Sequence, residues 1–284
     1  MRFVTVQREG YTEPALVTDE AVFGLRQAGF PDIQSVIAGA DDAFDRVARW
    51  IYHPPGGERF DPAKVKLLAP ILHPRKIICI GLNYRDHAEE GGNAVPDQPA
   101  VFAKFATALI GHGQSIVLPK ASTKPDYEAE LAVVIGRGGR YIPEERWREH
   151  VFGYTIANDV SARDFQSATT QWTMGKAFDT FAPIGPAVVT ADEIPDPHNL
   201  EISLTLSGSV MQRSNTSNMI FTVPWLIAYL SSVFTLEPGD LILTGTPAGV
   251  GFARKPPRWL KPGDECVVRI QGIGELYNPV VAEA

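Results

Sequence analysis

From Lys76 onward, the chain consists mainly of short apolar runs separated by glycine, proline and charged residues. Apolar runs of about four to eight residues between such breakers are typical of strands in a buried sheet. Helical patterns are fewer, in PEERWREHV and VPWLIAYLSSVF. The two kinds of segment do not alternate regularly enough for a Rossmann fold or an α/β barrel, so we predict a β-rich α+β fold. The predicted strands are KIICIG, ELAVVIG, VFGYTIAND, IGPAVVT, EISLTLSG, DLILTG and ECVVRIQGIG.

The first 70 residues have a different texture. MRFVTVQ and EPALVTDEAVFGL predict a strand and a hairpin, and DIQSVIAG and DDAFDRVARWI have helical spacing. The segment HPPGGERFDPAKV, residues 53–65, is rich in proline and glycine and is typical of a linker. We therefore predict a small α/β unit over residues 1–70 and a larger domain over residues 71–284.

Charge and hydropathy exclude several kinds of partner. The net charge is −7 and no basic run occurs, which argues against nucleic-acid binding. No apolar stretch approaches the roughly 18 residues needed to span a membrane, and the N-terminus lacks the apolar core of a signal peptide. The two cysteines are too few for a disulfide framework. We therefore expect a cytoplasmic protein.

Common catalytic motifs are missing from the sequence. It contains no G-x-S-x-G, no G-x-x-x-x-G-K-[ST], no H-E-x-x-H and no C-x-x-C. These absences argue against an α/β-hydrolase, a P-loop nucleotide-binding protein and the two common zinc patterns.

Two glutamates stand at the start of a predicted core strand. Residues two apart in a strand point to the same face, so Glu128 and Glu130 project together. Taken alone, the pair is more consistent with a solvated sheet end, because Glu is mostly exposed. Asp159 follows another apolar strand, and it can meet the pair if the two strands are neighbours. Three carboxylates without His or Cys suit Mg²⁺, Mn²⁺ or Ca²⁺.

Further polar residues have two readings each. His87 and Glu90 are three apart, so one helical turn places them side by side as a base and its orienting carboxylate, or as an incidental surface pair. Lys176 and Lys104 lie among apolar residues, which suits a counter-charge or an anion-binding group as well as a plain loop lysine. The loop after DLILTG has backbone amides that can cradle a carboxylate, although an ordinary turn is the simpler reading.

Six segments in one order give the chain a resemblance to the fumarylacetoacetate hydrolase family, in particular its bacterial-type members, over about residues 70–280. Each motif alone is weak, and their order carries the resemblance. The segments are GLNYRDHAEE, DYEAELAVVIG, GYTIANDVSARDFQ, GKAFDTFAPIGP, GDLILTGTPAGVG and LKPGDECVVRIQGIGELYNPV.

The resemblance implies a rolled sandwich of mixed sheets, usually dimeric, with a divalent metal. It implies that Glu128, Glu130 and Asp159 hold Mg²⁺ or Mn²⁺, with Ca²⁺ possible in crystals. It further implies that His87 and Glu90 activate water and that Lys176 assists. The substrate-binding positions that it implies are Lys104, Arg163, Gln166 and Thr246. We expect Asp126 to set up the turn before the strand rather than to serve the site.

The family's substrates are 2-oxo and 2,4-dioxo acids. We expect a hydrolase acting on carbon–carbon bonds in ketonic substances, which cleaves a 2,4-dioxo acid to pyruvate and a carboxylic acid through a metal-stabilised enolate. The alternative is an oxaloacetate decarboxylase or a 2-hydroxy-diene-dioate isomerase or tautomerase on the same site. The pair of His87 and Glu90 favours hydrolysis, since the other two reactions need no attacking water.

Overall fold

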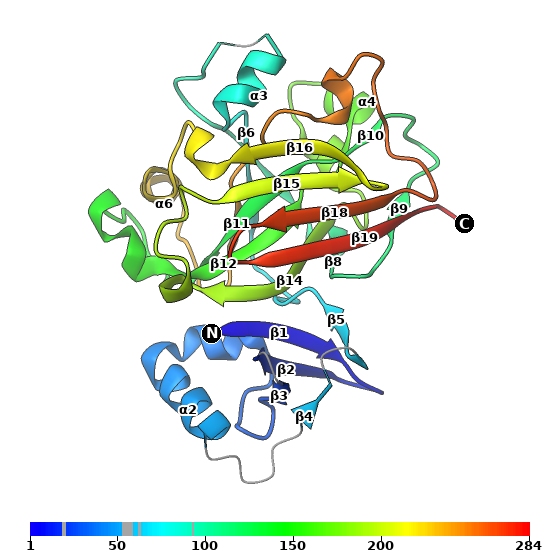
Figure 1. The fold of residues 1–284 in the computed structure, drawn as a ribbon. Helices are drawn as coiled ribbons and strands as arrows, with labels where there is room; N and C mark the ends of the chain where they lie inside the picture. The colour runs from blue at the N-terminus through cyan, green and yellow to red at the C-terminus, as the bar shows by residue number, and fades with distance from the viewer. Residues whose placement is uncertain (19–20, 53–58, 62–63, 93) are drawn as a thin grey trace.

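A computed structural model describes residues 1–284 except 19–20, 53–58, 62–63 and 93 (Figure 1). Much of the predicted linker over residues 53–65 therefore lies outside the described residues. The predicted β-rich α+β fold is confirmed, with two large sheets and few helices. None of the described helices is long and apolar enough to cross a membrane.

The larger sheet has twelve strands and runs through both parts of the chain. Its main path is β4-β3-β2-β1-β14-β12-β11-β17-β6-β7, with β5 beside β1 and β8 beside β14. Most pairs are antiparallel, but β17 with β6 and β14 with β8 are parallel, so the sheet is mixed. The bounds are β1 Arg2–Gln7, β2 Thr12–Val17, β3 Val22–Gly24, β4 Arg59–Phe60, β5 Lys66–Leu68, β6 Ile77–Gly81, β7 Ala100–Lys104, β8 Leu109–Ile110, β11 Ala129–Ile135, β12 Val151–Asn158, β14 Ala182–Thr190 and β17 Leu241–Leu243.

The second sheet has five strands in the order β16-β15-β18-β19-β9. It packs across β11, β12 and β14, as Figure 1 shows, and one large apolar cluster fills the space between the layers. Alternating burial along β15 and β18 is typical of strands with one face on a core. The bounds are β9 Ile116–Leu118, β15 Glu201–Leu206, β16 Ser209–Asn215, β18 Glu265–Ile270 and β19 Gly274–Ala282.

The N-terminal segment forms strands β1–β5 and helices α1 (Ile33–Ala38) and α2 (Ala40–Tyr52). An apolar cluster that includes Phe3, Ile33 and Val47 joins these helices to residues of β12 and β14. Strand β1 pairs with β14 through Arg2 opposite Val189 and Phe3 opposite Val188. The two regions thus share a sheet, and the boundary at residue 70 stays a prediction.

The helical predictions in the larger region have different outcomes. VPWLIAYLSSVF forms helix α6, Val223–Val233, with Pro224 in its first turn, where its missing N–H costs nothing. PEERWREHV instead forms a 3-10 helix, η3, over Glu144–His150, which packs on α6. The remaining short 3-10 segments are η2 Ala106–Ala108, η4 Ala191–Glu193, η5 Thr216–Asn218 and η6 Gly251–Ala253.

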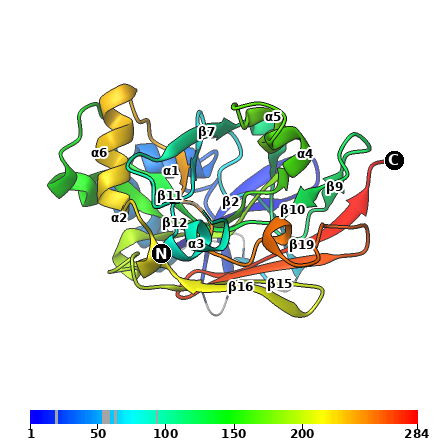
Figure 2. The ribbon, with the colours of Figure 1, turned by 90° about the horizontal axis from the view of Figure 1, so that it is seen from above.

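Three central strands bring the polar residues to one edge of the large sheet. Because β11 runs antiparallel to β12 and to β17, its first residues lie beside the last residues of both partners. Ala129 is opposite Asn158, and Ala132 is opposite Leu243. Around this edge lie α3 (Arg85–Glu90), α4 (Arg163–Gln166), α5 (Thr173–Lys176) and the short pair β10 (Pro125–Asp126) and β13 (Ser161–Ala162) (Figure 2).

Candidate active site

Three buried carboxylates meet at this edge of the sheet. Glu128 and Glu130 flank Ala129 at the start of β11, and Asp159 follows the end of β12. Their exposed fractions are only 5%, 1% and 0%. One carboxylate oxygen of each lies within 4.8 Å of the others. The pairing of β11 with β12 thus brings the three carboxylates together, as the alternation of side chains along a strand and the proposed neighbouring strands predicted.

Three cations compensate two of these carboxylates. Lys176 Nζ lies 2.7 Å from both Glu128 Oε2 and Asp159 Oδ2. Lys104 Nζ lies 2.5 Å from Asp159 Oδ1, and Arg163 Nη2 lies 2.7 Å from Glu128 Oε1. Burial alone would raise the pKa of Glu128, but Lys176 and Arg163 lower it to about 2. Glu128 is therefore ionised at neutral pH.

Glu130 is the carboxylate without such compensation. Its Oε2 accepts the backbone N–H of Gly245 at 2.7 Å, and it forms no ion pair within the described part of the chain. Burial, Asp159 and Glu128 raise the pKa of Glu130 well above its usual value. A divalent cation would remove this repulsion, and three hard oxygen ligands suit Mg²⁺ or Mn²⁺. The residues present therefore fit a divalent ion.

One loop after β17 holds three carboxylates with its backbone amides. Gly245 donates to Glu130, Gly249 donates to both oxygens of Glu90 at 3.0 Å, and Gly251 donates to Asp126 at 2.7 Å. Gly245 and Gly249 have φ values of +94° and +104°, a region that favours glycine. The loop is thus more than the ordinary turn that its sequence favoured, because its amides bind the protein's own carboxylates.

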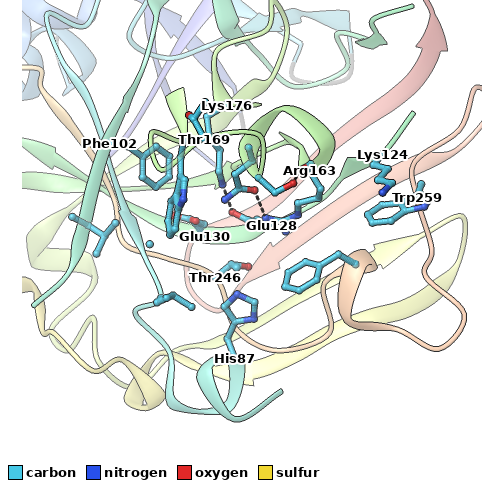
Figure 3. A pocket seen from close by; sticks show the side chains of 17 residues that line it. His87, Phe102, Lys124, Glu128, Glu130, Arg163, Thr169, Lys176, Thr246 and Trp259 are labelled. Atoms are coloured by element: carbon cyan, nitrogen blue, oxygen red, sulfur yellow. Dashed lines mark hydrogen bonds and ion pairs between the residues drawn. The ribbon is translucent and has the colours of Figure 1, made fainter. Parts of the chain in front are cut away.

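His87 and Glu90 come together on α3 as their spacing predicted. His87 Nδ1 lies 3.4 Å from Glu90 Oε2. Burial raises the pKa of Glu90, but the His87 contact and the Gly249 N–H outweigh it and lower the pKa below its usual value. A proton on Nδ1 that faces Glu90 leaves Nε2 as the basic nitrogen of His87. Because His87 lines the cavity, it can exchange a proton with a bound ligand (Figure 3).

A cavity of about 560 Å³ is lined by Glu128 and Glu130, but Asp159, the third carboxylate of the cluster, does not line it. Phe102 and Trp172 contact each other in the lining, with ring centroids 5.5 Å apart. Phe252 and Trp259 also line the cavity, and Trp259 lies on the other side of it from Phe102 (Figure 3). Its lining comprises Ile80, Gly81, Leu82, His87, Phe102, Lys124, Glu128, Glu130, Arg163, Gln166, Ser167, Thr169, Trp172, Lys176, Thr246, Phe252 and Trp259. A polar floor between aromatic walls suits a small anionic molecule.

The predicted substrate-binding residues divide into two groups. Arg163, Gln166 and Thr246 line the cavity, and Thr246 Oγ1 accepts a hydrogen bond from Gln212 Nε2 at 2.8 Å. Lys104 does not line it: its side chain is fully buried, and its ammonium also donates to Val160 O at 2.9 Å. In this structure Lys104 is a counter-charge to Asp159, and its contact with substrate stays a prediction.

Asp126 does more than set up a turn. It is fully buried, and its Oδ2 accepts a hydrogen bond from Arg163 Nε at 2.9 Å. Its position two residues before Glu128 indicates that it lies near the site, although the sequence alone favours a role in the turn. Gln212 binds the site from β16: besides donating to Thr246, it accepts the backbone N–H of Ala129 at 2.9 Å. No motif in the sequence of β16 predicts this role.

Comparison with known proteins identifies the class and then the family. The fold and the three-carboxylate cluster define an enzyme-like scaffold with a candidate divalent-metal site at a sheet edge. The sequence model of the fumarylacetoacetate (FAA) hydrolase C-terminal family matches residues 76–281. The chain belongs to the fumarylacetoacetate hydrolase family, as its motifs predicted.

Three similar proteins indicate the range of functions. The chain is 50% identical over 221 residues to mitochondrial oxaloacetate tautomerase FAHD2A of Bos taurus, covering 77% of this chain and 70% of that protein. Fumarylacetoacetate hydrolase from Exiguobacterium antarcticum has a TM-score of 0.88 and 35% identity, with both chains fully covered. Maleylpyruvate hydrolase from Sphingobium sp. SYK-6, in complex with manganese(II) and pyruvate, has a TM-score of 0.83 and 30% identity, again over both full chains.

These comparisons support an enzyme family and a divalent metal, but they do not favour the predicted hydrolase over its alternative. The Bos taurus relative is a tautomerase, and the structural neighbours include hydrolases. That relative is also named as mitochondrial, so the cytoplasmic location stays a prediction for this chain. The homodimer stays a prediction as well.

Proposed function

We propose that this protein interconverts the keto and enol forms of oxaloacetate, with a divalent metal at Glu128, Glu130 and Asp159. The observation that carries the proposal is that His87 lines the same cavity as Glu128 and Glu130, two members of a carboxylate cluster suited to such a metal. The 50% identity to an oxaloacetate tautomerase favours this reaction over carbon–carbon hydrolysis. The alternative reading of the sequence thereby becomes our main proposal.

Glu128, Glu130 and Asp159 would hold the metal, and the cationic residues of the cavity would contact the substrate's oxygens. When bound, a divalent ion supplies positive charge that polarises the 2-oxo group and acidifies the neighbouring C3–H. Arg163 and Lys176 provide cationic groups for carboxylates of the substrate, and Gln166 and Thr246 provide hydrogen-bonding groups in the same cavity lining. These contacts would fix the substrate's orientation relative to His87.

His87 performs the proton transfer in this proposal. Its Nε2 takes the proton from C3 while the C–H electron pair forms the C2=C3 double bond, and the carbonyl electrons move to the C2 oxygen. A proton delivered to that oxygen, by His87 or by solvent, completes the enol. Glu90 keeps Nδ1 protonated and stabilises the imidazolium that forms transiently.

Hydrolysis of a 2,4-dioxo acid to pyruvate and a carboxylic acid is the second candidate. The same pair, His87 and Glu90, can deprotonate a water instead of a carbon. The cavity of about 560 Å³ is also larger than a four-carbon dicarboxylate requires, which leaves room for an acyl tail.

One assay separates the two candidates. The purified protein with Mg²⁺ or Mn²⁺ is given the enol form of oxaloacetate, and its conversion is followed by ultraviolet absorbance. A parallel reaction with acylpyruvates measures pyruvate release. We expect the enol form to be converted faster than in the same metal solution without the protein, and little pyruvate to be released from acylpyruvates. Efficient pyruvate release without acceleration of the tautomerisation would establish the hydrolase instead.

A further inference from the structure

Asp126 has a denser set of contacts than a turn residue needs. Its Oδ1 accepts the backbone N–H of Tyr127 at 2.8 Å and that of Gly251 at 2.7 Å. Its Oδ2 accepts Arg163 Nε at 2.9 Å and the backbone N–H of Phe252 at 3.1 Å. Two oxygens thus serve four donors from three parts of the chain. Only the Tyr127 contact is local, so turn formation does not explain the other three.

The backbone around Asp126 is built to allow this approach. Asp126 pairs with Ser161 in the short β10–β13 ribbon, which brings it beside the start of α4. Gly251 comes so close that a Cβ there would lie 2.5 Å from Asp126 Oδ1. A side chain at position 251 would therefore push the loop away from the carboxylate.

Every nitrogen of the Arg163 guanidinium has a partner within the protein. Nε donates to Asp126, Nη1 donates to Gln166 Oε1 at 2.8 Å, and the Phe252 ring centre lies 4.6 Å from Cζ. Nη2 is buried and lies 2.7 Å from Glu128 Oε1. Because Arg163 also lines the cavity, these contacts hold a cationic group there in a fixed orientation.

We propose that Asp126 is a positioning residue that holds the Arg163 guanidinium in the orientation in which its charge stabilises an anionic ligand in the cavity. Without the anchor at Nε, the guanidinium can turn and pair with Glu128 through two parallel hydrogen bonds, the geometry that arginine and carboxylate prefer. Its charge would then be compensated more completely by Glu128 and would stabilise the ligand less. The proposal rests on the proposed function only in that the ligand is an oxo-acid anion.

The variant Asp126→Asn tests this role with little change in volume. An amide has one oxygen and one NH₂ group, so the NH₂ must face two donors that the carboxylate now accepts. Either Arg163 or the loop residues Gly251 and Phe252 lose their partner. We expect the variant loaded with Mn²⁺ to bind oxalate about tenfold to a hundredfold more weakly, the range for a charged hydrogen bond.

A double-mutant cycle distinguishes positioning from a general structural role. If Asp126 acts through Arg163, then Asp126→Asn should change the oxalate dissociation constant by less than about twofold in an Arg163→Met background. An equal loss in both backgrounds would overturn the proposal, and so would wild-type affinity in the single variant. The readout is calorimetric and needs no turnover, so a protein that binds oxalate but does not tautomerise oxaloacetate would refute only the proposed function.

Asp240 offers a matched control. It is a fully buried aspartate that accepts the backbone N–H groups of Lys76 and Glu237 and pairs with Lys76 Nζ at 3.0 Å. It precedes β17, at the opposite end of that strand from the site loop. Asp240→Asn should lower the melting temperature and leave oxalate affinity unchanged. A loss of affinity in this control as large as that in Asp126→Asn would mean that stability, not orientation, controls binding.

The wild-type protein gives a test that does not depend on a variant's folding. In a nitrogen-detected spectrum of arginine side chains, the Nε–H of Arg163 should exchange slowly with solvent and keep its chemical shift when oxalate binds. The Nη signals should shift. An Nε–H that exchanges freely, or that moves as much as the Nη groups, would contradict an anchor at Asp126.

Discussion

Gly245 donates its backbone N–H to Glu130 Oε2 over 2.7 Å, and this is the only hydrogen bond found for the Glu130 carboxylate among the described residues. One hydrogen bond does not compensate a buried charge that faces Asp159 and Glu128. The charge of Glu130 is therefore poorly compensated by the protein, and this favours the binding of a divalent cation at the site.

The variant Glu130→Gln should have opposite effects on the metal-free protein and on metal binding. Glutamine keeps an oxygen for the Gly245 N–H and removes the charge, so the free energy of unfolding without metal should rise by ~1–3 kcal/mol. Affinity for Mn²⁺ should fall at least about tenfold, since a charged ligand is lost. Denaturant unfolding and calorimetry measure the two quantities. A variant that is less stable without metal, or that binds Mn²⁺ normally, would refute the assignment.

The same carboxylate predicts how stability depends on pH. The pKa of Glu130 is higher in the folded protein than in the unfolded chain, so the folded state binds more protons between these two values. Its contribution to stability therefore falls as the pH rises through that window. Glu128 has the opposite sign: its contribution is lost as the pH falls from its unfolded value toward about 2. The stability difference between Glu130→Gln and the wild type, both metal-free, should accordingly shrink when the pH is lowered from 8 toward the unfolded pKa of roughly 4.3.

Lys176 and Lys104 form a matched pair of buried lysines, because both bind Asp159 but only Lys176 lines the cavity. Lys176→Met and Lys104→Met should each destabilise the metal-free protein by about 3–5 kcal/mol, the cost of leaving a buried partner charge unpaired. Only Lys176→Met should also weaken oxalate binding to metal-loaded protein. Equal losses of oxalate affinity in the two variants would show that Lys104 contacts the ligand after all.

His87→Ala should retain metal and oxalate affinity but lose catalysis. General base catalysis contributes about 10²–10⁴-fold to rate, and kcat should fall by that factor. Glu90→Gln should cause a smaller decrease, because it leaves the imidazole in place with a weaker orienting partner. Steady-state kinetics and calorimetry on the same samples provide the measurement. Unchanged kcat in His87→Ala would exclude this residue as the base.

Gly249→Ala tests the loop that binds Glu90. A Cβ at this position would lie 2.1 Å from Met211 O, and φ is +104°. The loop must shift, so the Glu90 contact and kcat should both be impaired, with a stability loss of at least about 1 kcal/mol. Gly263, with φ +88° and open space around its Cβ position, is the control. Gly263→Ala should cause similar backbone strain and leave kcat unchanged. If kcat falls equally in both variants, the contact between the loop and Glu90 does not control catalysis.

The central part of the fold could be predicted because its signals are local. Long apolar runs such as ELAVVIG form fully buried strands, and period-two alternation then places Glu128 and Glu130 on one side. Asp159 joins them because β12 is the neighbour of β11, a fact about pairing that the family resemblance implied and the apolar runs alone did not. His87 and Glu90 needed only one helical turn.

The missed features depend on contacts between distant segments. Nothing in the local sequence indicates that Lys104 pairs with Asp159 without lining the cavity. The local sequence around Asp126 suggests a turn residue because its partners Arg163 and Gly251 lie 37 and 125 positions away in the chain. The pattern in PEERWREHV predicts a helix but not its 3-10 form, and this segment packs on α6.

Anomalous diffraction at the manganese edge, from crystals grown with Mn²⁺ and oxalate, would locate the metal directly. We expect a manganese peak between the carboxylates of Glu128, Glu130 and Asp159, with oxalate in the cavity beside Arg163. A crystal saturated with Mn²⁺ that shows no peak between these three carboxylates, or shows the ion bound elsewhere, would contradict this expectation.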